Sequence, residues 1–252
     1  MVVNLLLLEK REFVDTMLRL FIPIMSLLAL TSCASEYQIK GTSSISRLDG
    51  KMLFVKIPEE NQMVKIDSAE VVHGLFAMKG AVDSTMLAAL YMDDISIIPF
   101  VIEKGKINVS IDNARTQING TPLNDKLAAF IAKKISIDDR AYELEHKENQ
   151  MIMDGKTPEE IDDELTKERQ KLVEELNGLA KAFIKSNYDN ILGPGIFGMI
   201  CSGFDIPLMT PLIDEVMKDA PESFRCHPMV KEYIEAARRN MDRIKHNIQS
   251  QP

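Results

Sequence analysis

The chain has few of the residue types that build catalytic or metal centres. Its 252 residues include no tryptophan and only four histidines, which stand far apart and lack the spacing of metal ligands: His73, His146, His227 and His246. No Gly-x-Ser-x-Gly elbow, phosphate-binding loop or dinucleotide fingerprint occurs in the sequence. We therefore expect no metal, no cofactor and no enzymatic activity.

Cysteine is scarce, and its three copies form no Cys-x-x-Cys motif that would mark a redox pair. Cys201 ends an apolar run and is predicted to be a buried free thiol. Cys226 follows Arg225, whose positive charge slightly favours a reactive thiolate. Two alternatives stay open. One is a redox or enzymatic role for Cys201 or Cys226, and the other is a disulfide between them, which would stabilise the fold by about 3 kcal/mol.

A surplus of basic residues is also missing. The chain has 30 Lys and Arg residues against 38 Asp and Glu residues, which gives a formal net charge of −8. Such a chain lacks the electrostatic footprint of a nucleic-acid-binding protein, so we expect no nucleic-acid partner. Methionine, in contrast, is frequent at 15 residues. Methionines fill irregular gaps in a core, and they also form adaptable binding surfaces.

Long apolar runs are absent except near the N-terminus. Residues 18–30 are almost wholly apolar. At about a dozen residues this run is too short to span a bilayer, which takes about 20. A charged start, an apolar run and small residues at its end are typical of a secretory signal. We predict a signal peptide at residues 1–32, with Met17 as an alternative start.

Cys33 directly follows this segment, and the four residues from Leu30 to Cys33 resemble the lipobox of bacterial lipoproteins. The resemblance implies that Cys33 is acylated and becomes the first residue of the mature chain. Ala34 and Ser35 bring no acidic run of the kind linked to surface export in some lipoproteins. We therefore expect a lipid anchor at Cys33 that holds the protein in the bacterial outer membrane, facing the periplasm.

Residues 33–120 are predicted to form a β-rich domain, because short apolar segments alternate with turn residues. The eight predicted strands are Tyr37–Gly41, Lys51–Ile57, Met63–Val72, Leu75–Lys79, Met86–Tyr91, Ile97–Ile102, Lys106–Ile111 and Thr116–Ile118. Asp49-Gly50 is a strong hairpin pattern, and His73-Gly74 and Lys104-Gly105 are further tight reversals. This spacing predicts an antiparallel β-sandwich or an open barrel.

Residues 121–252 are predicted to form a helical domain, because apolar residues now recur at helical spacing. Thr121 supplies a capping hydroxyl before a proline suited to the first helical position. Thr157 and Glu160 form a capping box for a second helix. Two long helices with a short connection predict an antiparallel hairpin.

The last helix carries apolar residues that alternate four and three apart: Val230, Ile234, Ala237, Met241, Ile244 and Ile248. Packing against the rest of the helical region is one explanation, and a docking strip for a partner helix in an assembly is the other. Gly193-Pro-Gly195, between the long hairpin and the shorter helices, is interpreted as a hinge or turn.

A set of short motifs runs through the β-rich region in a fixed order. They are Ile66-Asp67-Ser68-Ala69, Gly74-Leu-Phe76, Gly80, Phe100-Val-Ile-Glu-Lys-Gly105 and Asn119-Gly-Thr-Pro-Leu-Asn124. Together they resemble a domain of unknown function at the N-terminus of many bacterial thioredoxin-like lipoproteins. Structural roles explain residues such as Asp67 and Gly80, with a ligand contact as the alternative. The helical region resembles the spacer that precedes the thioredoxin domain in such proteins.

No thioredoxin active site accompanies this resemblance, because the sequence has no Cys-x-x-Cys and no tryptophan to flank one. The redox activity of the related proteins is therefore not carried over. We predict an α+β protein, with a sandwich or open barrel followed by a helical hairpin. Its expected function is that of a membrane-anchored, non-catalytic binding or interaction module, with the membrane and a possible protein as partners.

Overall fold

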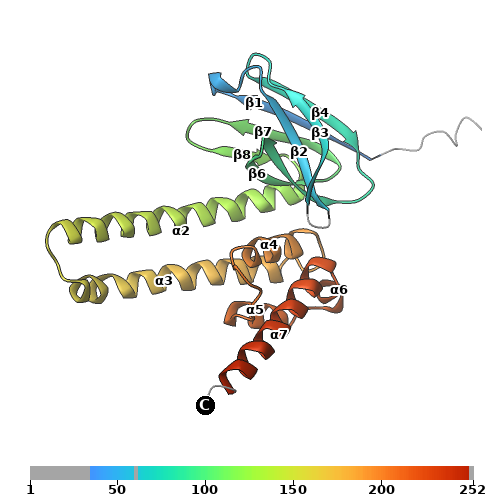
Figure 1. The fold of residues 1–252 in the computed structure, drawn as a ribbon. Helices are drawn as coiled ribbons and strands as arrows, with labels where there is room; N and C mark the ends of the chain where they lie inside the picture. Colours follow the sequence, from blue (N-terminus) through green and yellow to red (C-terminus); the bar gives the residue numbers. More distant parts are fainter. Residues whose placement is uncertain (1–34, 60–61, 250–252) are drawn as a thin grey trace, which may run out of the picture. The chain divides into compact units, whose positions relative to one another are not determined.

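The computed structural model describes residues 35–59 and 62–249. All eight predicted strands form there, and most extend the predicted range by one or two residues (Figure 1). They are β1 (Glu36–Ser43), β2 (Met52–Glu59), β3 (Gln62–Glu70), β4 (Leu75–Ala81), β5 (Met86–Met92), β6 (Ile95–Ile102), β7 (Gly105–Ile111) and β8 (Thr116–Asn119). The predicted signal peptide and Cys33 lie outside the described residues.

The strands form two sheets of four. Sheet A has the order β4-β1-β7-β8, and sheet B has the order β3-β2-β5-β6. Every pair is antiparallel except β1 and β7, which run parallel. The predicted α+β class is confirmed, and of the two predicted β architectures the sandwich forms, because the sheets are not closed into a barrel.

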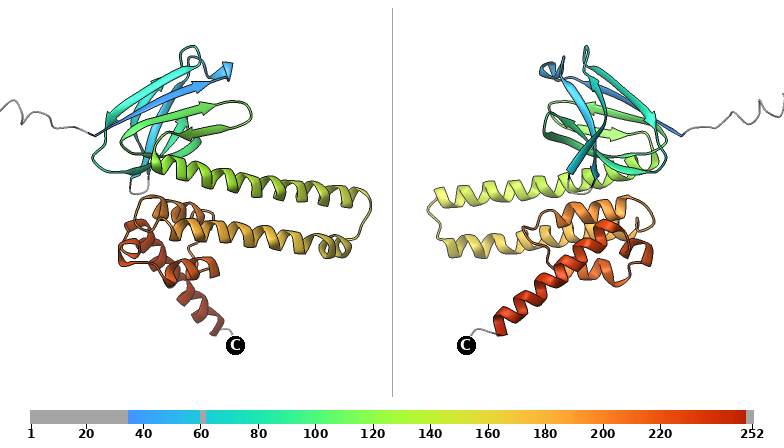
Figure 2. Two further views of the ribbon diagram at one scale, coloured as in Figure 1. Left: turned by 180° about the vertical axis from the view of Figure 1, so that it is seen from behind. Right: turned by 45° about the vertical axis from the view of Figure 1, so that its right-hand side comes forward.

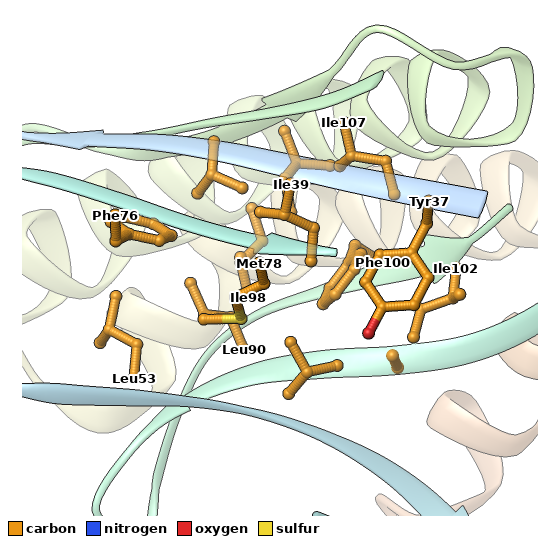
Figure 3. Close-up of a cluster of buried hydrophobic side chains, with 14 of the residues drawn as sticks. Tyr37, Ile39, Leu53, Phe76, Met78, Leu90, Ile98, Phe100, Ile102 and Ile107 are labelled. Atoms are coloured by element: carbon orange, nitrogen blue, oxygen red, sulfur yellow. The ribbon is translucent and has the colours of Figure 1, made fainter. Parts of the chain in front are cut away.

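One core lies between the sheets, where alternate residues of both point inward. Ile39 and Ile107 from sheet A and Leu53 and Phe100 from sheet B are each at most 1 % exposed. Figure 3 shows the inward-facing side chains of the two sheets packed against one another. The alternation of apolar and polar residues along β7, with burial at every second position, is what assigns its two faces.

The prediction of a hairpin at Asp49-Gly50 is wrong. The chain first forms the short 3-10 helix η1 (Ser46–Leu48), and Gly50, with φ of 77°, then turns it from sheet A into sheet B. His73 and Gly74, with φ of 51° and 72°, likewise reverse the chain between β3 and β4, which belong to different sheets. A tight-turn pattern identifies a reversal but does not say whether the flanking strands pair.

Six helices follow the sandwich in the described chain. They are α2 (Pro122–Met153), α3 (Pro158–Lys185), α4 (Leu192–Cys201), α5 (Pro211–Lys218), α6 (Glu222–Arg225) and α7 (Pro228–Gln249). The predicted antiparallel hairpin is α2 with α3, which lie side by side in both views of Figure 2. A small apolar cluster around Leu144 and Leu165 packs the two helices far along the hairpin. Among these helices none is long and apolar enough to cross a membrane.

The capping box of α3 is present, but the predicted cap of α2 is not. Thr157 and Glu160 bond reciprocally as predicted. At α2 the hydroxyl of Thr121 makes no cap bond to the backbone. Instead the carboxylate of Glu103, which follows β6, accepts hydrogen bonds from the N–H groups of Leu123 (2.8 Å) and Asn124 (3.1 Å). The orphan donors at the start of α2 are therefore satisfied by the sandwich.

Asn124 provides a second, fully buried link between α2 and β6. Its Oδ1 accepts a hydrogen bond from the N–H of Val101 at 2.9 Å, and its Nδ2 donates to the carbonyl of Val101 at 2.8 Å. The same Nδ2 donates to the hydroxyl of Thr121 at 2.8 Å, which explains why that hydroxyl does not cap the helix. Val101 belongs to β6, which is an edge strand of sheet B. Asn124 therefore hydrogen-bonds backbone groups that have no neighbouring strand to pair with.

The C-terminal helix packs along its first half. Val230, Ile234 and Ala237 are at most 5 % exposed, as the packing explanation predicts. Ile244 is 38 % exposed, so the seam leaves the core before the helix ends. A docking strip for a partner helix on this second half stays a prediction.

Replacing Asn124 with alanine tests whether this residue holds the helical region on the sandwich. We expect Asn124→Ala to lower the free energy of unfolding by about 3 kcal/mol, because it leaves the buried N–H and carbonyl of Val101 unsatisfied. Urea unfolding followed by circular dichroism measures the change. The matched control is Asn177→Ala on the exposed face of α3, which should change stability by less than about 0.5 kcal/mol. Equal effects of the two substitutions would contradict the assignment.

Candidate functional site

A groove of about 870 Å³ lies between the outer face of sheet B and the helices α4 and α7. We call it the apolar groove. The sheet contributes Met63, Leu87, Ala89, Tyr91 and Pro99, among others. The helices contribute Phe197, Met199, Met229, Tyr233 and Ala236, among others. Its lining includes one charged residue, Glu232, whose side chain lies in an exposed position.

Helix α4 lies close to both β5 and α7 because glycines of α4 face these two elements, and this close packing shapes the groove. A Cβ atom on Gly195 would lie 3.0 Å from Leu87 Cδ2, and one on Gly198 would lie 2.2 Å from the sulfur of Met229. The prediction of a hinge at Gly193-Pro-Gly195 is wrong, because these residues form the buried first turn of α4. Pro194 is tolerated there because the first helical N–H groups have no intrahelical partner.

One end of the groove is held by the loop after α4. The hydroxyl of Tyr233 accepts a hydrogen bond from the N–H of Leu208 (3.2 Å) and donates to its carbonyl (3.1 Å). Asn240 Nδ2 donates to the carbonyl of Pro207 at 2.9 Å. The same loop exposes Phe204 (39 %) and Ile206 (52 %) beside residues that line the groove. Exposed apolar side chains next to an apolar groove are typical of an interaction site.

Methionine side chains occupy both walls and the rim. Met63 and Met199 are each about 40 % exposed, and Met229 is half-buried. Met side chains have three rotatable bonds and a polarisable sulfur, so they adapt to ligands of different shape. The interpretation of methionine as core filler therefore applies to Met78 and Met151, which are buried, but not to the methionines of the groove.

Cys201 also lines the groove, and its surroundings make it an unreactive thiol. Burial raises the pKa of the Cys201 thiol to about 12, although the nearby Tyr233 side chain lowers it in part. At neutral pH the thiolate, which is the nucleophile, is therefore very rare. The prediction of a buried free thiol is confirmed.

Cys226 lies in an exposed position and is likewise free. The structure therefore contains no disulfide between Cys201 and Cys226, and this alternative is not supported. The guanidinium of the neighbouring Arg225 binds the backbone at the end of α5. Its Nη2 donates to the backbone carbonyls of Met217 (3.0 Å) and Lys218 (3.4 Å).

The described residues contain no group of three or more His, Cys, Asp or Glu side chains that could hold a metal ion. Three of the four histidines, at positions 73, 146 and 227, have separate local settings. His73 lies in a turn, His146 makes an edge-to-face contact with Tyr142, and His227 is half-buried before α7. Burial lowers the pKa of His227, and its Nδ1 has no hydrogen-bond partner.

The motif residues of β3 and β4 contact strand β1 within the sandwich, and none of them lines the groove. The hydroxyl of Tyr37 donates to Asp67 Oδ2 at 2.8 Å, and burial raises the pKa of this hydroxyl. A Cβ atom on Gly80 would lie 2.8 Å from the Tyr37 ring, so only glycine leaves room for it. Phe76 is buried across Gly41 in the same way. These contacts give the motif residues structural roles.

Comparison with known proteins gives a family match for part of the chain. Residues 37–127 match the family model of a domain of unknown function, DUF4369. The matched segment covers most of the β-rich region. The match confirms the resemblance inferred from the motifs, and it runs past β8 into α2 as far as Leu127. No curated protein and no solved structure matches the chain.

The family domain therefore includes the link between Asn124 and Val101. Its last two motifs, Phe100–Gly105 and Asn119–Asn124, supply every residue of that link. The apolar groove, in contrast, takes one wall from the domain and the other from α4 and α7, outside the match. Sequence analysis missed it, because it depends on contacts between segments about 100 residues apart. The glycines of α4 were the one available indication.

Thiol labelling tests the assigned states of the two cysteines. We expect the folded protein to react at Cys226 with a disulfide reagent at pH 8, and Cys201 to react only after denaturation. A pKa near 12 lowers the thiolate fraction of Cys201 about 1,000-fold relative to an unperturbed thiol, before shielding by the fold is counted. The variants Cys226→Ser and Cys201→Ser assign the signal. Rapid native labelling of Cys226→Ser would show that Cys201 is reactive.

Proposed function

We propose that the protein is a non-catalytic binding module, anchored by lipid at Cys33 in the bacterial outer membrane and facing the periplasm, which holds an elongated apolar small molecule in the apolar groove. The groove carries this proposal. Its volume of about 870 Å³ falls within the range of about 300–1,000 Å³ typical of small-molecule sites. Its mostly apolar lining with a few polar groups, including Ser96, Ser202 and the tyrosine hydroxyls, is also typical of such sites.

The properties of the groove favour binding over catalysis. A catalytic pocket brings together titratable groups with perturbed pKa values in positions to exchange protons. Here the strongly shifted group is Cys201, and its shift suppresses the reactive thiolate. Burial raises the pKa of Tyr233, and its hydroxyl proton is donated to the carbonyl of Leu208. Neither group is prepared to move a proton to or from a ligand.

The anchor rests on the sequence around Cys33 and on the related lipoproteins that the β-rich domain resembles. An acylated cysteine with several chains holds a protein firmly at a membrane, whereas a single chain holds it weakly. A binding module on such an anchor would keep its ligand near the membrane surface, where apolar molecules concentrate.

Filling the groove tests the binding site. The probe is N-phenyl-1-naphthylamine, a neutral apolar dye whose fluorescence rises in apolar surroundings. We expect it to bind wild-type protein and to bind Ala236→Phe at least about tenfold more weakly, because the added ring occupies the groove. Ala132→Phe, on the exposed face of α2, is the matched control and should bind like wild type. Equal dye binding by both variants, with circular dichroism unchanged, would contradict the assignment.

Replacing the lipidation cysteine tests the anchor. We expect radiolabelled palmitate to enter the wild-type protein in cells and to be absent from Cys33→Ala, which should then appear in the soluble fraction. Cys226→Ser is the matched control, because it removes another accessible thiol and should leave labelling intact. Palmitate incorporation that survives in Cys33→Ala would overturn the proposed anchor.

A further inference from the structure

The outer face of sheet A carries three lysines close together. Gln38 on β1 pairs with Lys79 on β4 and with Lys106 on β7, so the two lysines flank it on one face. Lys40 lies two residues further along β1, on the same face. Neighbouring strands lie about 4.8 Å apart, so Lys79 and Lys106 project from backbone positions about 10 Å apart. We call these residues the lysine face.

The charges of the lysine face are not neutralised by the fold. All three lysines are exposed, and none forms a salt bridge with a carboxylate of the described residues. Among the outward positions of sheet A, Glu36 is the one carboxylate in the described chain, and Glu70 of β3 lies at the rim. In a chain with a formal charge of −8, this face has a local positive excess.

The face is also shaped and partly apolar. A hollow of about 660 Å³ runs along it, lined by Lys40 and by the polar side chains of Thr42, Asn108, Ser110 and Asn119, among others. At its far edge Leu75 is 59 % exposed. A surface with lysines, polar side chains and an exposed apolar edge suits the headgroup region of a bilayer.

The chain length between the anchor and sheet A places this face near a membrane. Three residue steps separate Cys33 from Glu36, and an extended chain gains at most about 3.5 Å per residue. The start of β1 is therefore held within about 10 Å of an acylated Cys33, and Gln38 within about 17 Å. This tether lets the lysines beside Gln38 come within the Debye length of about 8 Å at physiological salt, at which a charged membrane attracts them.

From the tether and the charge pattern together we infer that the lysine face is a membrane-docking surface, which lies on anionic phospholipid headgroups of the bilayer that holds Cys33. This inference rests on the proposed anchor. The acidic part of the helical hairpin agrees with this orientation. Residues 138–168 contain 12 acidic and four basic residues, so an anionic surface repels them. The attraction at sheet A and the repulsion at the hairpin both favour the orientation in which sheet A faces the membrane.

The experiment supplies the tether chemically, so that its outcome does not depend on acylation in cells. The chain from Cys33 onward contains the whole compact unit Glu36–Pro252. With Cys226→Ser, it is coupled through Cys33 to a maleimide-bearing lipid in vesicles, since Cys201 is buried. The vesicles contain either phosphatidylcholine alone or phosphatidylcholine with 30 % phosphatidylglycerol. A water-soluble amine-acetylating reagent followed by mass spectrometry then gives the labelling rate of each lysine.

We expect Lys40, Lys79 and Lys106 to be labelled about tenfold more slowly on the anionic vesicles than on the neutral ones, and 1 M salt to remove the difference. The exposed hairpin lysines Lys133 and Lys167 should be labelled equally fast on both. Equal rates for the lysine face on the two vesicles would overturn the inference. Equal protection of the hairpin lysines would overturn it as well.

A pair of variants tests the cooperation within the face, with Lys79 as the reporter. Each lysine at an anionic surface strengthens contact about fivefold, so Lys40→Gln with Lys106→Gln should weaken it about 25-fold and remove the protection of Lys79. The matched control, Lys133→Gln with Lys167→Gln, carries the same change in charge and should leave that protection intact. Protection of Lys79 that survives in the first pair would contradict docking by the lysine face. If cells do not acylate Cys33, the proposed anchor fails while this result stands.

Discussion

The rest of the structure depends on one buried side-chain amide, which forms hydrogen bonds with backbone groups at the edge of sheet B. Asn124 bonds both the N–H and the carbonyl of Val101, and Glu103 caps the first turn of α2 from the same segment. Together they fix the direction in which α2 leaves the sandwich. Because α3 packs along α2 and α4 follows α3, this direction also decides where α4 and α7 meet the sheet. The apolar groove is thus a consequence of a polar contact.

The sequence predicted the parts of the fold that local patterns control. The eight strands, the capping box at Thr157 and the burial of Val230 and Ile234 follow from alternation, capping chemistry and helical spacing. Asp49-Gly50 was misinterpreted because a turn pattern does not say which sheet receives the next strand. Thr121 was misinterpreted because its hydroxyl has a competing partner in Asn124, which local spacing does not reveal.

The candidate site was less accessible to sequence reasoning, for a physical reason. Its walls come from four strands of sheet B on one side and from α4 and α7 on the other, so no single segment carries its pattern. Gly195 and Gly198 look like flexible residues in the sequence, but in α4 they serve close packing against Leu87 and Met229. Only the partners across the interface distinguish these two uses of glycine. Cys201, in contrast, was assigned correctly because its neighbours in sequence are themselves apolar.

The sandwich lies between the proposed anchor and the apolar groove. In a two-sheet sandwich the outer faces point in opposite directions, separated by a core about 10 Å thick. The lysine face belongs to sheet A and the apolar groove to sheet B. If sheet A lies on the membrane, the groove opens on the side away from the bilayer. A ligand would then reach it from the periplasm rather than by lateral diffusion from the lipid. The family domain would act as a spacer of fixed thickness between the two.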